Sequence, residues 1–185
     1  MRGDLSTPRL RLRPLAASDE WLYCGLYTDP DVMRHVAEPL AADAARRAFR
    51  AVLEQVAANP PKACYWAMLP REGGDAIGLM ACLPDRDDAG SAEVGVLLQA
   101  AVACRGYAAE AIAALADAVF ARPGQRRLWT RHAPGNGPAL GLMRKLGFTP
   151  LNGPDGGSTP LRWQLGRQAW LARRTAVFAS PPANC

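Results

Sequence analysis

Apolar and polar positions repeat with different periods along this chain, and each period predicts a type of secondary structure. Residues 10–15 alternate apolar and basic side chains, which is the pattern of a half-buried strand. Residues 19–28 then place apolar side chains, Trp21 among them, three and four positions apart, as an amphipathic helix does. Ser18 or Asp19 is expected to cap the start of this helix through its side chain.

The rest of the chain combines further helices with a group of strands. Apolar runs in the middle alternate with turns rich in Gly, Asp and Pro, which predicts an antiparallel meander. Helices are expected over residues 41–58, 106–120 and 138–146, the last closed by Gly147 in a left-handed conformation, and strands over residues 64–69, 76–83, 92–98, 127–130 and 159–165. This order predicts an α+β fold, with a mixed, mostly antiparallel sheet of six or seven strands and helices on both faces.

The composition is that of an ordinary protein domain. Of the 185 residues, 49% are hydrophobic and 21% are charged, which excludes wholesale disorder. No apolar run approaches the ~18 residues of a membrane span, and no apolar signal core follows the first residues. We therefore expect a cytoplasmic protein with no membrane partner. Residues 1–179 are expected to form one domain, and residues 180–185 a loose tail.

The formal net charge of +5 comes mainly from arginines. Such a balance suits a nucleic-acid binder, and equally an enzyme whose substrate carries phosphates. The arginines are scattered, without a recognised reader motif or interleaved aromatic residues, so no nucleic-acid partner is expected. The cysteines form no Cys-x-x-Cys pair, and His35 and His132 lie far apart, so no metal site is expected either.

The segment that carries chemistry is a strand, a glycine-containing turn and a helix start at residues 94–111. A helix N-terminus exposes unpaired N–H groups and a partial positive charge, so it can accept a phosphate. Gly106 lets the backbone come close to an anion, Ala108 and Ala109 leave the approach open, and Arg105 could add an ion pair. Taken alone, a purely structural turn explains this glycine equally well.

The order of features around this turn resembles the GNAT superfamily of acyl-CoA-dependent N-acetyltransferases, over about residues 7–170. In that superfamily a splayed strand precedes an Arg/Gln-x-x-Gly-x-Gly/Ala loop, which binds the coenzyme A pyrophosphate. Gly106 and Ala108 match the last two motif positions, whereas Ala103 departs from the first. Residues 136–148 resemble the second motif, an asparagine before a helix that ends Lys-Leu-Gly-Phe.

Three further stretches of sequence resemble one branch of this superfamily in particular. Residues 7–13, 27–33 and 164–170 are similar to the branch that contains the ribosomal-protein-alanine N-acetyltransferases. Because one fold hosts many acceptors, this similarity suggests a substrate without fixing it. A homodimer is common in the family, and the sequence leaves the oligomeric state open.

The resemblance implies transfer of an acetyl group from acetyl-CoA to a primary amine, on a protein N-terminus or on a small molecule. The amine would attack the thioester directly, with no covalent enzyme intermediate, and the strand backbone would pair with the pantetheine arm. The residues that the resemblance assigns to the cofactor are Val96, Leu97, Leu98, Arg105, Gly106, Tyr107, Ala108, Ala109 and Asn136.

The catalytic residues are less clearly marked. Glu93 interrupts an apolar strand, and several superfamily members use a glutamate on this strand as general base; a solvated carboxylate is the alternative. Asn136 could equally be only a helix cap. Where relatives place a general acid, this chain has Met143 and Ala139, which cannot donate a proton. Two hypotheses follow: an N-acetyltransferase without a general acid, or a catalytically degenerate acyl-CoA-binding sensor or partner module.

Overall fold

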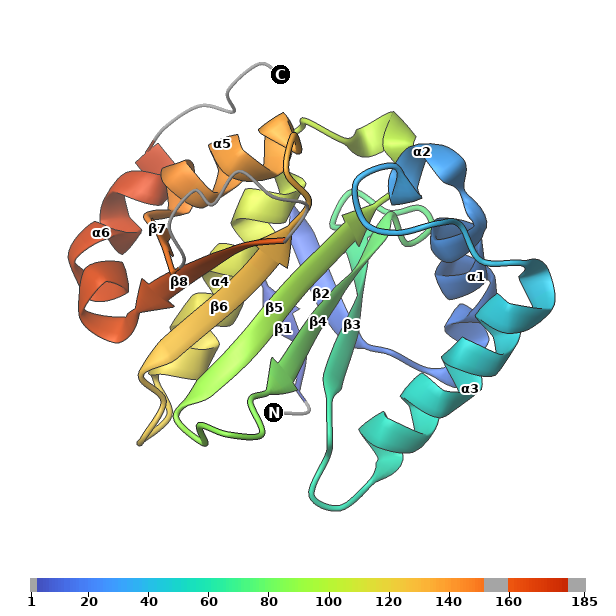
Figure 1. Cartoon of the computed structure of the whole chain (residues 1–185), viewed down its shortest axis with the longest axis horizontal. Helices are drawn as coiled ribbons and strands as arrows, with labels where there is room; N and C mark the ends of the chain where they lie inside the picture. Colours follow the sequence, from blue (N-terminus) through green and yellow to red (C-terminus); the bar gives the residue numbers. More distant parts are fainter. Residues whose placement is uncertain (1–2, 152–159, 180–185) are drawn as a thin grey trace.

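The strands of the chain form a single mixed sheet, seen in the computed structural model of residues 3–151 and 160–179 (Figure 1). The strand order is β1-β2-β3-β4-β5-β6-β8-β7, and all neighbours are antiparallel except β5 and β6. The strands are β1 (Leu5–Ser6), β2 (Leu10–Pro14), β3 (Cys64–Pro70), β4 (Gly78–Pro84), β5 (Ser91–Leu98), β6 (Arg127–His132), β7 (Thr149–Pro150) and β8 (Leu161–Gly166).

Helices cover both faces of this sheet. They are α1 (Glu20–Thr28), α2 (Pro30–Met33), α3 (Ala42–Ala57), α4 (Tyr107–Phe120), α5 (Gly137–Leu146) and α6 (Arg167–Ala179), with short 3-10 segments η1 (Ala17–Asp19) and η2 (Ala100–Val102). Buried residues of α4, α5 and α6 share one apolar cluster with the sheet, and those of α1 and α3 share a second. Among the described residues, no helix combines the length and the apolar character that crossing a bilayer requires.

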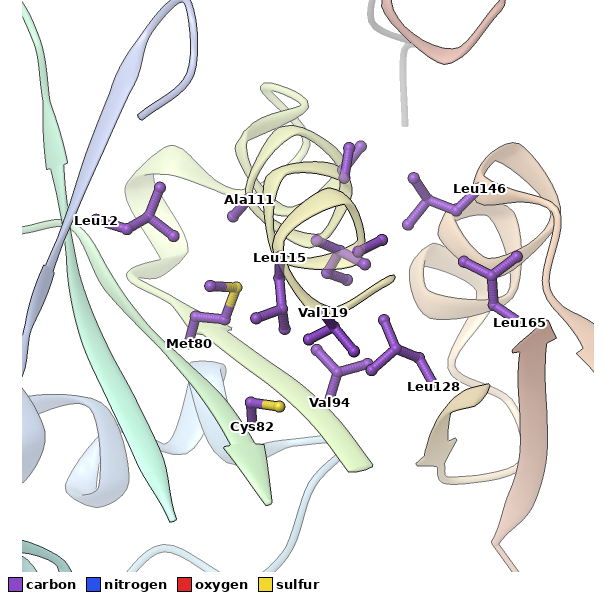
Figure 2. Close-up of a cluster of buried hydrophobic side chains, with 14 of the residues drawn as sticks. Leu12, Met80, Cys82, Val94, Ala111, Leu115, Val119, Leu128, Leu146 and Leu165 are labelled. Atoms are coloured by element: carbon purple, nitrogen blue, oxygen red, sulfur yellow. The ribbon is translucent and has the colours of Figure 1, made fainter. Parts of the chain in front are cut away.

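Helix α4 is the centre of the larger apolar cluster. Figure 2 shows side chains from several strands pointing at it, with Leu115 and Val119 of the helix meeting Met80, Val94 and Leu128 of the sheet. Small alanines on the same helix let it approach the sheet closely. Full burial of each such leucine or valine stabilises the fold by roughly 1.5–3 kcal/mol. The start of α4 is therefore held rigidly against the strands, which matters for any ligand bound there.

The predicted fold class is confirmed, with differences in detail. The sheet has eight strands rather than six or seven, because β1 and β7, of two residues each, were not predicted. Helix α6 was not predicted either. The last predicted strand begins within residues 152–159, which lie outside the described part of the chain, as does the expected tail at residues 180–185. Gly147 closes α5 with a φ of 83°, as predicted.

Two expectations for the first helix were wrong. Asp19 occupies the N-cap position of α1, but its side chain makes no capping hydrogen bond there; the buried carboxylate instead accepts hydrogen bonds from Arg13 at 2.7 and 3.0 Å and from the backbone N–H of Ala16 at 2.8 Å. Trp21 lies outside the apolar face and is 51% exposed. The buried carboxylate therefore ties the end of β2 to the start of α1, a contact between strand and helix rather than within the helix.

The closed end of the β5–β6 pair is fixed by side chains as well as by backbone. Asp88 accepts a hydrogen bond from Ser91 at 2.7 Å and pairs with Arg127 at 3.1 Å, while Arg127 also donates to the Ser91 hydroxyl at 2.9 Å. The hydrogen bonds from Ser91 and from the N–H of Gly90, together with Arg126, hold the pKa of Asp88 below its ordinary value. The two strands are thus locked together where they begin.

We predict that Asp19→Ala destabilises the fold by about 2–3 kcal/mol, because it leaves the Arg13 guanidinium and the Ala16 N–H without their acceptor. Urea unfolding measures this change. Arg11→Ala is the matched control, since Arg11 pairs with Asp4 at 2.8 Å on the exposed surface and its loss should cost less than about 1 kcal/mol. Equal losses in the two variants would contradict the structural role of Asp19.

Candidate functional site

The middle of the sheet opens between β5 and β6. Their parallel pairing runs from Ser91↔Arg127 to Glu93↔Trp129 and stops there, although both strands continue. On its other side β5 remains paired with β4 along its whole length. Gly95, in the middle of this central strand, is exposed, as expected where a neighbouring strand has moved away. The opening lies beside the second half of β5, beyond the last paired residues Glu93 and Trp129.

Backbone hydrogen bonding fixes which residues of β5 face the opening. The N–H of Gln99 donates to Ile77 at 2.9 Å, and the C=O of Ser91 accepts from Asp85 at 3.0 Å, both on the β4 side. The register with β4 is uninterrupted between these points. Because the backbone polar groups of a strand alternate between its two sides, odd-numbered residues point theirs at β4 and even-numbered residues point theirs at β6.

The three strand residues assigned to the cofactor, Val96, Leu97 and Leu98, therefore differ in the side of β5 that their backbone groups face. Val96 and Leu98 direct their N–H and C=O groups into the opening, where β6 no longer pairs with them. Leu97 directs its backbone groups to β4, opposite Leu79, and its side chain packs against the α1–α3 cluster. The polar backbone groups of a partly buried strand edge need hydrogen-bonding partners. An extended amide chain of a ligand could supply them, as an added strand would.

The chain runs from the end of β5 through η2 and residues 103–106 to the start of α4. Gly106 precedes the helix with a φ of 81°, and Cys104 also has a positive φ, of 65°. The N–H of Glu110 donates to the C=O of Gly106 at 3.1 Å, as the first α-helical hydrogen bond. By helix geometry, the N–H groups of the three residues before Glu110 have no partner within the helix. They belong to Tyr107, Ala108 and Ala109, all assigned to the cofactor from the sequence.

A buried carboxylate lies within this helix start. Glu110 is 8% exposed. Its Oε1 accepts from the Thr7 hydroxyl and from the N–H of Arg9 at 2.7 Å, and its Oε2 accepts from Arg9 Nε at 2.7 Å. Burial alone would raise the pKa of Glu110, but the hydrogen bonds from Thr7 and Arg9 outweigh it and leave the pKa below its ordinary value. This pair joins residues about a hundred positions apart in the chain.

Glu93 lies on the opposite face of the sheet from α4. Side chains alternate along a strand, so Glu93 and Gly95 share the face of Leu97 and the α1–α3 cluster. Glu93 Oε1 pairs with Arg131 Nε at 3.0 Å, and Glu93 is 21% exposed. The carboxylate is therefore neither isolated nor freely solvated: it is partly buried and held by an arginine of β6.

Small residues lie next to Glu93 on this face. Tyr65, Ala81 and Gly95 are opposite one another on β3, β4 and β5, so two positions beside the tyrosine have little or no side chain. Burial raises the pKa of Tyr65 to about 12, and the nearby Tyr27 and Glu93 add to the shift. Its hydroxyl is consequently protonated at neutral pH and can donate a hydrogen bond, but it is a weak acid.

Met143 and Ala139, at the positions where the resemblance implies a general acid, have non-polar side chains. Met143 is 4% exposed and its side chain belongs to the apolar core. Ala139 only donates its N–H to Asn136 Oδ1, at 3.0 Å. Asn136 therefore caps α5, which was the alternative considered for it, and the donor end of its amide is what could contact a ligand. Among residues 3–151 and 160–179, no group of three His, Cys, Asp or Glu side chains could hold a metal ion.

A surface pocket of about 440 Å³ lies on the Glu93 face, beside the far end of β5. It is lined by residues of α1, including the exposed Trp21, and by Gln99 and η2. Gln99 directly follows β5 and lies six residues beyond Glu93 in extended chain, a separation of roughly 20 Å. The pocket therefore lies too far from Glu93 to hold a group that this carboxylate deprotonates.

The sequence and the fold of this chain both have counterparts among known proteins. The family model described as the acetyltransferase (GNAT) domain matches residues 9–149. The chain belongs to the GNAT acetyltransferase family. The uncharacterized N-acetyltransferase p20 of Bacillus licheniformis is 24% identical to this GNAT chain over 144 residues, covering 78% of this chain and 81% of that protein.

Solved GNAT structures share the fold. The acetyltransferase from Agrobacterium tumefaciens str. C58 superposes with a TM-score of 0.72 at 26% identity, over 88% of this chain and 93% of that one. Spermidine N-acetyltransferase from Vibrio cholerae, solved in complex with CoA and spermine, gives a TM-score of 0.73 at 17% identity, over 88% of this chain and 98% of that one. At such low identity the second match shows the fold alone.

Three residues of this GNAT site were not found from the sequence. Arg9 and Glu110 meet only through the fold, although a glutamate in an otherwise apolar helix face was a visible signal of a buried partner. Arg131 lies in the part of β6 that extends beyond the predicted strand, so its approach to Glu93 depends on where β6 ends.

We predict that the stability difference between wild type and Glu110→Gln depends on pH. A carboxyl whose pKa is lowered in the folded state stabilises the fold above its unfolded pKa of about 4.3, and that contribution is lost as the pH falls through the folded value. Unfolding free energies from pH 7 to pH 3 should therefore converge at the acid end. The exposed turn variant Glu72→Gln is the control, and a gap that stays constant with pH would contradict the assignment.

Proposed function

We propose that this GNAT protein transfers the acetyl group of acetyl-CoA to a primary amine. The observation that carries the proposal is the edge of β5 at Val96 and Leu98, whose backbone groups β6 does not pair, followed along the chain by the amides at the start of α4. An acyl-CoA has the chemistry for both parts: an amide-containing arm for the strand edge and a pyrophosphate for the helix start.

The assignment of residues follows from this placement. The amides of Tyr107, Ala108 and Ala109 would bind the pyrophosphate, and the exposed Arg105 would add a charge-assisted contact. Each hydrogen bond from such an amide to a charged group contributes roughly 1.5–3 kcal/mol. Asn136 would contribute the donor end of its amide.

The amine would react on the Glu93 face. Because β6 pairs with β5 only as far as Glu93, an acetyl group held at the free β5 edge would lie between the two faces of the sheet. On the α4 face, Val94 and Leu128 are buried in the core. On the other face, Gly95 leaves open surface next to the Glu93 carboxylate, which could accept a proton from the attacking amine.

The acceptor that suits this site has a low amine pKa. At pH 7 an α-amine with a pKa of about 7.8 is about 14% neutral, so its deprotonation costs about 1 kcal/mol. A lysine-like amine with a pKa near 10.4 would cost about 4.6 kcal/mol. Arg131 pairs with the Glu93 carboxylate at 3.0 Å, so protein N-terminal α-amines, which lose their proton at the lower cost, are the favoured acceptors. This choice agrees with the similarity of residues 7–13 and 27–33 to the ribosomal-protein-alanine N-acetyltransferases.

A second candidate function is an acyl-CoA-binding sensor or partner module without turnover. The buried Met143 and the non-polar Ala139 favour it, because neither can protonate the leaving thiolate. An enzyme can work without a general acid, because the thiol of coenzyme A, with a pKa near 8.5, can leave as the thiolate. At pH 7 this costs about 2 kcal/mol. Turnover therefore separates the two candidates.

We predict that wild type releases free thiol from acetyl-CoA in the presence of an alanine-initiated peptide or spermidine. Glu93→Gln should lower kcat/KM by about 10²–10⁴ if the carboxylate is the general base, with the smaller loss for the peptide α-amine. Thiol release measured over a pH series gives both values. Glu72→Gln, on an exposed turn, is the matched control and should retain wild-type rates.

Binding is followed in parallel by the melting temperature with and without acetyl-CoA, which a ligand of the folded state raises. Glu93→Gln should keep this rise, because its side chain lies on the face opposite α4. Binding by wild type without turnover on either amine would favour the sensor. No rise in melting temperature at saturating acetyl-CoA would contradict both candidates.

A further inference from the structure

Arg9 connects the beginning of β2 to both ends of the turn before α4. Its Nε and its backbone N–H donate to Glu110, each at 2.7 Å, and its Nη1 donates to the C=O of Arg105 at 3.0 Å. Its guanidinium also lies 4.7 Å from the centre of the Tyr107 ring, in a cation–π contact. Arg9 thus contacts two residues that the proposed function assigns to the pyrophosphate, Arg105 and Tyr107, and the neighbouring Glu110.

The charge of Glu110 makes these contacts matter for an anionic ligand. Glu110 is the fourth residue of α4, so its backbone lies about 6 Å along the axis from the helix start. Its pKa is held below the ordinary value, so the group is anionic at neutral pH. An unpaired buried carboxylate at this place would oppose the attraction that the helix N-terminus exerts on a phosphate. The arginine cancels that charge.

The same arginine also holds the turn in shape. By accepting from Arg9, the Arg105 carbonyl is directed toward the β1–β2 turn, while Gly106 and Cys104 keep their left-handed conformations on either side of Arg105. Thr7 secures the other end of the pair, because its hydroxyl donates to Glu110 and also accepts from the N–H of Leu10 at 2.8 Å. The turn is therefore ordered by contacts from β2 before any ligand arrives.

We propose that Arg9 is a positioning residue for the pyrophosphate of an acyl-CoA: it neutralises Glu110 and holds the 103–106 turn in its binding conformation. The inference rests on the proposed function. It adds to the cofactor site a residue, Arg9, that lies outside the loop motif at residues 103–108. Arg9 does not need to touch the ligand. Its contribution comes from order and charge balance, both already present in the free protein.

The test compares two ligands that differ only beyond the pantetheine arm. Acetyl-CoA contains the pyrophosphate and acetyl-pantetheine does not, and calorimetric titration gives the dissociation constant of each. We expect Arg9→Gln to weaken acetyl-CoA about tenfold, which corresponds to about 1.4 kcal/mol, and to leave acetyl-pantetheine unchanged. Arg11→Gln, on the same strand and paired with the exposed Asp4, is the matched control and should change neither.

Removing the negative charge of Glu110 should have the opposite effect on acetyl-CoA binding from removing the positive charge of Arg9. Glu110→Gln removes the negative charge and keeps Arg9, so acetyl-CoA should bind at least as tightly as to wild type. The double variant Arg9→Gln/Glu110→Gln should recover part of the affinity that Arg9→Gln loses, because no unpaired carboxylate remains. If the Arg9–Glu110 pair only stabilised the fold, Arg9→Gln and Glu110→Gln would break the same contact and weaken acetyl-CoA binding alike. The double variant would then recover no affinity.

The outcomes separate this inference from the proposed function. If wild type binds no acetyl-CoA, the proposed function fails and the role of Arg9 fails with it. If wild type binds but Arg9→Gln weakens both ligands equally, or neither, only the role of Arg9 is overturned. Should Arg9→Gln fail to fold, Arg9→Lys supplies the test: it keeps the charge but cannot span the carboxylate and the carbonyl, so a loss for acetyl-CoA alone is expected and an equal loss for both ligands contradicts it.

Discussion

A central strand whose second half is paired on one side only is the constraint on which the rest of this structure depends. β5 is bonded to β4 along its whole length, but β6 leaves it after Glu93. Inside a sheet, unpaired N–H and C=O groups are costly unless they find partners. The chain keeps this edge by locking the strands together at one end, through Asp88, Ser91 and Arg127.

Side chains of β5 alternate between the two faces of the sheet, so the two faces have different roles. Even-numbered residues of β5 send their backbone groups into the opening and their side chains toward α4, which fixes the helix start beside it. Odd-numbered residues send their side chains to the opposite face, where Glu93 and Gly95 lie. Ligand binding and proton transfer can therefore use the same strand without competing for the same atoms. In the proposed function, the acetyl group would lie between the two faces.

Local sequence patterns predicted most of the helices and strands, but they did not predict the contacts between these elements. The alternation at residues 10–15 and the periodicity of α4 depend on neighbours within a few residues, so both could be found from the sequence. α6 was missed because, among its residues with described side chains, only Trp170 is buried. The difference between Leu97 and its neighbours depends on the register with β4, and the meeting of Arg9 with Glu110 depends on the whole fold.

Hydrogen exchange of individual backbone amides, with and without acetyl-CoA, tests the central claim most directly. The N–H groups of Val96 and Leu98, at the open strand edge, should become protected when the ligand binds, together with those at the start of α4. The amide of Leu97, already bonded to β4, should change little. Saturating acetyl-CoA that leaves Val96 and Leu98 exchanging as in the free protein would contradict the account.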